Sequence, residues 1–189
     1  YSVVGLADKP LAVHHILSEK GMERVLVFTH SNDNVHRLAL VLASLGHKTG
    51  ELHSQVTRRK KVLGGLSKGV YKVVVCSDVV ARGIDLEDLD AVISYDAPSY
   101  VKTYIHRVGR TARAGKAGTA FTLCDEKQAK PFLKMLRDGN VTGCEERPIT
   151  SDHLDPLRED YEKSLDKVKE QLQQEKVDQS ARSNDKQKK

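Results

Sequence analysis

The amino-acid sequence predicts an α/β protein of three layers, with a mostly parallel sheet of five to seven strands between two layers of helices. The first observation is the alternation, over about 140 residues, of short apolar runs with segments of helical periodicity. The second is that central runs such as RVLVF (24–28) and YKVVVC (71–76) are continuously apolar after Arg24 and Lys72. Strands that are covered by helices on both faces have this pattern, because neither face meets water.

Each predicted element has its own local signal. Pro10 begins the first helix, and Ser31 or Asn32 can cap the second, in which Val35, Leu38 and Leu42 recur at helical spacing. Gly46 ends that second helix. The predicted strands are residues 2–4, 24–28, 47–52, 71–76, 91–95 and 118–123. The further predicted helices are residues 57–66, 101–112 and 127–136, and residues 77–90 are predicted as a polar loop.

The composition changes near residue 150, which divides the chain into three parts. We expect one folded domain at 1–150, a charged extension at 151–175 that can form a helix, and a disordered tail at 176–189. Residues of the extension recur as a thin apolar stripe that could pack on the domain: Leu157, Tyr161, Leu165, Val168 and Leu172. Because the chain begins with Tyr1, we expect it to be a piece of a longer protein.

Charge and cysteine content limit the classes of function. The 31 Lys and Arg residues outnumber the 26 Asp and Glu residues, and the excess lies within residues 1–154. This surplus is compatible with a nucleic-acid partner. Three distant cysteines suggest neither a disulfide framework nor a zinc site, and no metal ligands are predicted. No stretch is long and apolar enough for a membrane span, so no membrane partner is expected.

The segment YIHRVGRTARAGKAG (104–118) is the most informative. On a helix, His106, Arg110 and Arg113 would share one face, with Gly109 inside the helix. Residues 97–124 contain no Asp or Glu to balance the cations. Arg suits bidentate contact with phosphate oxygens, so this face is interpreted as an anion site rather than as a solvated basic face.

The loop SDVVARGID (77–85) is the second informative segment. It leaves a buried strand at the edge where parallel sheets bind ligands. Gly83 lets a polyanion approach the backbone closely, and Asp85 can accept hydrogen bonds from a sugar hydroxyl. A simple turn that contains Gly and a helix-capping Asp remains an alternative for this loop taken alone.

Together these segments resemble one family. VLVFTHS (25–31), LHS (52–54), VVVCSDVVARGID (73–85), YDAP (95–98) and HRVGRTAR (106–113) have the order and spacing of the second, C-terminal RecA-like domain of DEAD-box ATP-dependent RNA helicases. The resemblance covers residues 1–140 and implies the RecA-like fold. It also implies that two such domains close on ATP and RNA.

The resemblance implies a role for each matching residue. Arg110 and Arg113 match arginine fingers that reach the γ-phosphate, and Asp85, beside Gly83, matches the carboxylate that holds the ribose. His106 and Arg107 match residues that couple the two domains. Residues in motifs that contact or order the RNA backbone are Ser31, His53, Ser54, Ser77, Asp78, Arg82 and Gly83.

Some positions depart from the family pattern. Ser54 stands where Gly is usual, Ser77 where Thr is usual, and Ala112 where Gly is frequent. Residues 58–61 read RRKK in place of Gln-x-x-Arg, so RNA contacts by Arg58 and Lys61 are left open.

The chain has neither a phosphate-binding G-x-x-x-x-G-K-[ST] loop nor a DEAD sequence. An N-terminal RecA-like domain is therefore expected to bind most of the ATP and Mg²⁺, and this domain alone is expected to be inactive.

The particular sequences SDVVARGID (77–85) and HRVGRTARAG (106–115), together with the charged extension, are similar to those of helicases of ribosome assembly. This resemblance implies a nucleolar, and hence nuclear, monomer that acts on rRNA, single-stranded or duplex, together with ribosome-assembly factors. The alternatives are a non-catalytic RNA-binding or protein-interaction module with the same fold, and a DNA translocase of the same superfamily.

Overall fold

A computed structural model describes residues 1–18, 22–56, 58–81, 89–112 and 117–187. Within these residues, six parallel strands form one sheet in the order β1-β6-β5-β2-β4-β3. The strands are β1 (Ser2–Val3), β2 (Val25–Thr29), β3 (Thr49–Leu52), β4 (Val73–Ser77), β5 (Ala91–Ser94) and β6 (Thr119–Cys124). The helices are α1 (Lys9–Ser18), α2 (Asn32–Ser44), α3 (Arg59–Ser67), α4 (Asp78–Ala81), α5 (Val101–Val108), α6 (Glu126–Asp138) and α7 (Ser151–Gln187).

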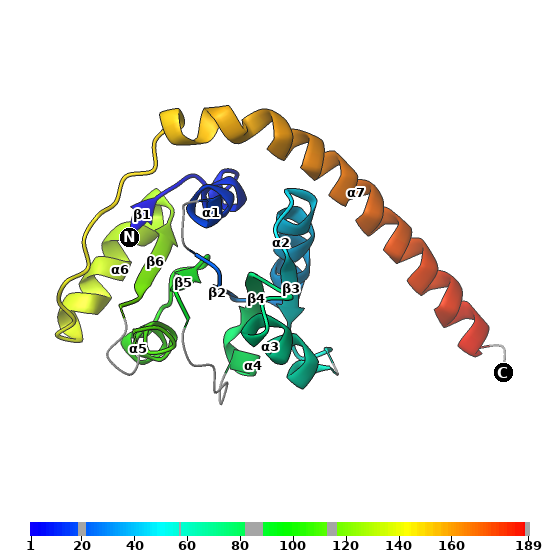
Figure 1. Ribbon diagram of the computed structural model, residues 1–189, viewed down its shortest axis with the longest axis horizontal. Coiled ribbons are helices and arrows are strands. Elements are labelled where there is room, and N and C mark those ends of the chain that lie inside the picture. The colour runs from blue at the N-terminus through cyan, green and yellow to red at the C-terminus, as the bar shows by residue number, and fades with distance from the viewer. Residues whose placement is uncertain (19–21, 57, 82–88, 113–116, 188–189) are drawn as a thin grey trace.

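The sheet lies between two layers of helices, so the predicted three-layer α/β fold is confirmed (Figure 1). Side chains alternate between the two faces of β2. Val25 and Val27 belong to the core beneath α1, α2 and α7, whereas Leu26 and Phe28 belong to the core that contains Leu66 of α3. The apolar runs seen in the sequence thus reflect strands that are buried on both faces.

Local capping explains where two helices begin. The Ser31 hydroxyl accepts a hydrogen bond from the backbone N–H of Asn34 at 3.1 Å, which confirms Ser31 rather than Asn32 as the N-cap of α2. Asp125 and Gln128 form a capping box at the start of α6. One element was not predicted: the short helix α4 begins at Asp78, directly after β4, where the sequence predicts a loop. A carboxylate in the first turn favours a helix there.

The long helix α7 crosses α1 and α2 and then continues beyond the body of the molecule (Figure 1). Leu154, Tyr161 and Val168 are buried in the core shared with α1 and α2. The Tyr161 hydroxyl donates to the carbonyl of Ala7 at 3.1 Å. The charged extension therefore packs on the domain as part of its core.

The sequence predicts a disordered tail from residue 176, but the structure has helix as far as Gln187. Side chains one turn apart support this part of α7 without burial: Gln174 donates to Asp178 at 2.9 Å, and the Ser180 hydroxyl donates to the carbonyl of Lys176. Upstream, His36 lies 2.9 Å from Glu175, which ties the helix to α2.

Two histidines form a half-buried pair between α1 and the end of α2. His14 Nδ1 lies 2.7 Å from His47 Nε2, so one ring donates and the other accepts. Burial, and then the neighbouring His14 and Lys72, lower the pKa of His47 to about 4. Burial also lowers the pKa of His14, and the nearby Asp160 opposes that effect. Both rings are therefore neutral at pH 7.

We expect acidification to destabilise the fold through this pair. A histidine whose pKa is lower in the folded state than the ordinary ~6.5 leaves the unfolded chain with more bound protons, so stability falls as the pH falls from about 6.5 toward 4. The loss should reach about 1–2 kcal/mol at pH 5. Urea unfolding of the wild type and of His47→Gln at pH 7 and pH 5 measures it, and the variant should lose less. An equal loss in both proteins would contradict the assignment to this pair.

Candidate nucleotide and RNA interface

The predicted RNA-binding residues that the structure describes gather at the carboxyl edge of the sheet. Ser31 follows β2, His53 and Ser54 follow β3, Ser77 ends β4 and Asp78 begins α4. In a parallel sheet these strand ends lie at one edge, which is where such folds bind ligands. The other predicted site residues, Arg82, Gly83, Asp85 and Arg113, lie outside the described residues.

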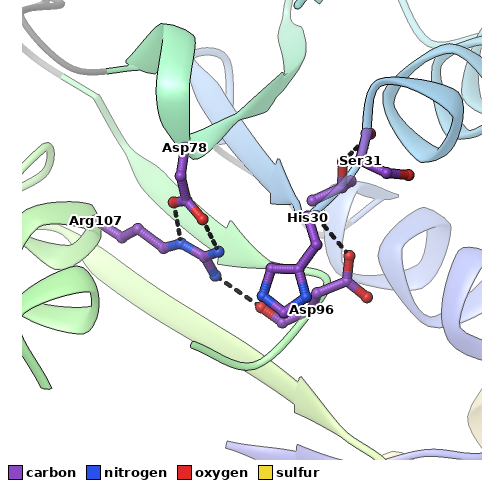
Figure 2. A network of polar contacts seen from close by, with 6 residues as sticks. His30, Ser31, Asp78, Asp96 and Arg107 are labelled. Carbon is purple, nitrogen blue, oxygen red and sulfur yellow. Dashed lines mark hydrogen bonds and ion pairs between the residues drawn. The ribbon is translucent and has the colours of Figure 1, made fainter. Parts of the chain in front are cut away.

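Arg107 is the centre of a polar network that joins three segments (Figure 2). Its Nε and Nη2 donate to the two carboxylate oxygens of Asp78 at 2.7 and 2.6 Å, and its Nη1 donates to the carbonyl of Asp96 at 2.7 Å. Its guanidinium carbon lies 5.2 Å from the centre of the Phe28 ring. Arg107 is only 1% exposed. In this structure it therefore holds α4, α5 and the end of β5 together.

This network gives Asp78 and Arg107 a contact that the sequence does not reveal. The sequence assigns Asp78 to the RNA motif and Arg107 to coupling between domains, and the structure pairs them inside one domain. The Asp78 side chain remains 28% exposed, whereas that of Arg107 is covered. Of this pair, then, Asp78 is the one that a bound strand can still reach.

Asp96 is a positioning residue that the sequence analysis missed. Its carboxylate accepts a hydrogen bond from the backbone N–H of His30 at 2.8 Å, which fixes the turn before Ser31 (Figure 2). Its carbonyl receives the bond from Arg107. One residue thus connects the β2–α2 turn with the Arg107 network. Its place in YDAP, directly after a buried strand, was the available signal.

The turns after β2 and β3 are also joined to each other. Asn32 Nδ2 donates to the Ser54 hydroxyl at 2.8 Å, and both Ser31 and Ser54 are exposed. Ser54, which stands where the family pattern has Gly, is therefore held by a hydrogen bond from Asn32. Ser77, by contrast, is buried and pairs with Thr29 in the sheet, so its place is suited to ordering the edge rather than to direct contact.

His53 has an unsatisfied polar atom. The residue is 9% exposed, and among the described residues its buried Nδ1 has no hydrogen-bond partner. A buried polar group without a partner costs about 1–3 kcal/mol. Because this atom is covered, bound RNA would not contact it in this arrangement, so the RNA role of His53 stays a prediction.

The predicted basic helix is shorter than the sequence suggests. The sequence predicts helix through residue 112 with Gly109 inside it, but α5 ends at Val108 and Gly109 is its C-cap. His106 and Arg110 therefore do not share the face of a continuous helix, and that prediction is wrong. The expectation that the cations of residues 97–124 lack a balancing acid is also wrong for Arg107. Asp78, which lies outside that segment, pairs with it.

Thr111 explains why the helix ends early. Its hydroxyl donates to the carbonyl of Leu89 at 2.5 Å, and the two residues form a β-bridge. Gly118 packs so closely that a Cβ there would lie 2.0 Å from the Thr111 hydroxyl oxygen. The chain therefore leaves the helix to dock beside the end of the loop that precedes β5. A Thr-to-backbone contact across 22 residues has no periodic signal in the sequence.

Arg110 lies just past α5, in the turn that leads to Thr111. It is half-buried, and its Nε donates to the carbonyl of His106 at 3.2 Å. Arg110 is therefore neither fully exposed nor without a hydrogen bond. The His106 side chain is exposed. The side chain of Arg110 is thus held against the backbone of the last turn of α5, the turn that carries His106.

Among the described residues, no group of three or more His, Cys, Asp or Glu side chains is arranged to hold a metal ion. Within the same part of the chain, no helix is both long and apolar enough to cross a membrane.

Comparison with known proteins now defines the class. A model of the helicase conserved C-terminal domain matches residues 8–115. The Escherichia coli DEAD-box protein SrmB, in a complex with the regulator of ribonuclease activity A, superimposes with a TM-score of 0.74 at 32% identity, covering 82% of this chain and 90% of that one. The chain is thus a RecA-like helicase C-terminal domain.

More specifically, the chain belongs to the DEAD-box RNA helicases. It is 39% identical over 184 residues to human ATP-dependent RNA helicase DDX51, covering 96% of this chain and 28% of that protein. It is 39% identical over 173 residues to DEAD-box ATP-dependent RNA helicase 1 of Oryza sativa subsp. japonica, covering 88% of this chain and 33% of that protein. The chain therefore spans about a third or less of these curated relatives.

Proposed function

We propose that this chain is the C-terminal half of an ATP-dependent RNA helicase, and that ATP hydrolysis by the full-length protein drives RNA unwinding or remodelling of RNA–protein complexes. The observation that carries the proposal is the shared sheet edge. There the Arg107–Asp78–Asp96 network ties the segment of Arg110 to the turns of Ser31 and Ser54. A mechanical link between a nucleotide site and an RNA site is what such an enzyme requires.

On the nucleotide side, Arg110 and Arg113 would act as arginine fingers toward ATP bound mainly by an N-terminal RecA-like domain. A guanidinium there stabilises the charge that develops during phosphoryl transfer. Asp85, beside Gly83, would hold the ribose, and Mg²⁺ bound with ATP would neutralise phosphate charge. His106 would contact the N-terminal domain, and Arg107 would support that contact from inside the domain.

On the RNA side, Ser31, His53, Ser54 and Asp78, together with Arg82 and Gly83, would contact or order the sugar–phosphate backbone, with Ser77 ordering the edge from beneath. Hydroxyls and backbone amides give affinity without reading the sequence. The turn that carries Ser31 is joined to the turn that carries Ser54 by the hydrogen bond from Asn32 to the Ser54 hydroxyl. These hydroxyls therefore need little reorganisation when RNA binds.

The finer assignment rests on the resemblance of the motifs. We propose a monomeric nucleolar protein that acts on rRNA with ribosome-assembly factors. We also propose that residues 1–150 form the helicase domain, and that residues 151–175 and 176–189 are an added extension and tail whose helix packs against α1 and α2.

The test measures ATP hydrolysis by the full-length protein with no nucleic acid, with poly(U) RNA and with poly(dT) DNA. Stimulation by RNA alone is expected, because ribose hydroxyls distinguish the two polymers. Equal stimulation by both would favour a DNA translocase. Binding of RNA without any ATP hydrolysis would favour the non-catalytic module.

A further inference from the structure

A groove lined by none of the proposed RNA-contacting residues lies between α6 and the segment that follows it. Its volume is about 730 Å³, and its apolar lining includes Leu133, Leu136 and Val141. Helix α6 packs against β6, near one end of the strand order, whereas the turns of Ser31 and Ser54 follow β2 in the middle and β3 at the opposite end. RNA bound at those turns would therefore not be expected to occupy this groove.

The wall of the groove is fixed by packing and hydrogen bonds. The Val141 N–H donates to the carbonyl of Leu136 at 2.9 Å, and Val141 packs on the cluster of Phe132 and Leu136. Further along, the Arg147 N–H donates to the carbonyl of Tyr1 at 2.7 Å. The groove is therefore preformed, which lowers the entropy that a ligand must lose to bind it.

The rim of the groove is basic. Among its described lining residues the charged side chains are Lys130, Lys134 and Arg137, all exposed and on successive turns of α6. The acidic residues of α6, Glu126 and Asp138, stand at its two ends, outside that lining.

Pro131 also lines the groove from inside α6. Its apolar ring adds to the floor formed by Leu133, Leu136 and Val141. The groove thus offers an apolar floor and a row of cations.

We propose that this groove docks an acidic peptide segment of a partner protein, with an apolar side chain inserted against Leu133 and Val141 and carboxylates placed on Lys130, Lys134 and Arg137. A peptide fits better than RNA, because the floor is aliphatic and no aromatic side chain is among its described lining residues to stack on a base. Charge complementarity at the rim favours fast and selective association.

The experiment uses fluorescence anisotropy with the 189-residue chain and a labelled dodecapeptide of Asp and Glu around one Leu-Phe pair. We expect saturable binding that weakens about tenfold when Leu-Phe is replaced by Ser-Ser. The double variant Lys134→Glu/Arg137→Glu should also bind about tenfold more weakly, since each exposed ion pair contributes modestly. The matched control Lys127→Glu changes an exposed lysine of α6 that does not line the groove, so it should bind as the wild type.

Thermal unfolding confirms that each variant folds, and a Lys-rich peptide with the same Leu-Phe pair should regain affinity for the charge-reversed variant. Absence of saturable binding at 1 mM peptide would overturn the proposal. So would an equal effect of Lys127→Glu, or loss of single-stranded RNA binding in Lys134→Glu/Arg137→Glu but not in Lys127→Glu. That last result would assign the face to RNA.

Discussion

Replacing Arg110 by Ala is expected to lower RNA-stimulated ATP turnover by the full-length protein by about 10³-fold or more, with a much smaller change in RNA affinity. An arginine finger contributes about 10³–10⁵ in rate, because its charge acts on the transition state more than on bound ATP. Arg110 sits in a turn fixed by Thr111 and Leu89, so it is already held near one position. Steady-state kinetics with saturating RNA measure the loss.

Two variants sharpen the interpretation. Arg110→Lys keeps a charge but loses the planar fork, so most of the loss should remain. Lys102→Ala removes an exposed cation from α5, two turns before Arg110, and should leave turnover within about twofold, because an exposed surface charge contributes little. If Arg110→Ala behaves like Lys102→Ala, Arg110 is no arginine finger.

The sheet could be predicted from the sequence because its signals are local. The apolar runs that became β2 and β4 are buried on both faces, and the Ser31 cap requires only residues three positions apart. Patterns of this kind are complete within a few residues of the chain. Prediction of the strands and of the fold therefore needed no knowledge of tertiary contacts.

For the candidate site, the sequence predicted which residues take part but not which of them contact each other. Asp78 and Arg107 are 29 positions apart, and no period or spacing shows that they pair. The end of α5 depends on Thr111 reaching Leu89, so the helical spacing of Arg110 suggested a face that does not form. Likewise, the helix after residue 175 depends on side-chain pairs along α7 and on its upstream anchors, whereas composition alone favoured disorder.

Replacing Arg107 by Ala is expected to destabilise the domain by about 3 kcal/mol. Breaking a buried ion pair costs about 3–5 kcal/mol, because the remaining charge loses its partner, and the partial exposure of Asp78 places this case at the low end. The matched control is Lys72→Ala, which breaks the exposed pair with Glu23 at the same 2.6 Å distance. That variant should cost under about 1 kcal/mol. Urea unfolding at pH 7 measures both.

Asp78→Asn then separates the two roles of Asp78. An amide retains the shape and one acceptor but removes the charge, so it should lower stability while leaving Arg107 partly held. If Asp78 acts mainly by holding Arg107, the folded variant should bind single-stranded RNA within about threefold of the wild type, and the stability effects of Asp78→Asn and Arg107→Ala should be strongly non-additive. Additive stability losses, together with a large loss of RNA affinity, would instead make Asp78 a direct RNA contact, because its exposed oxygens would then act independently of Arg107.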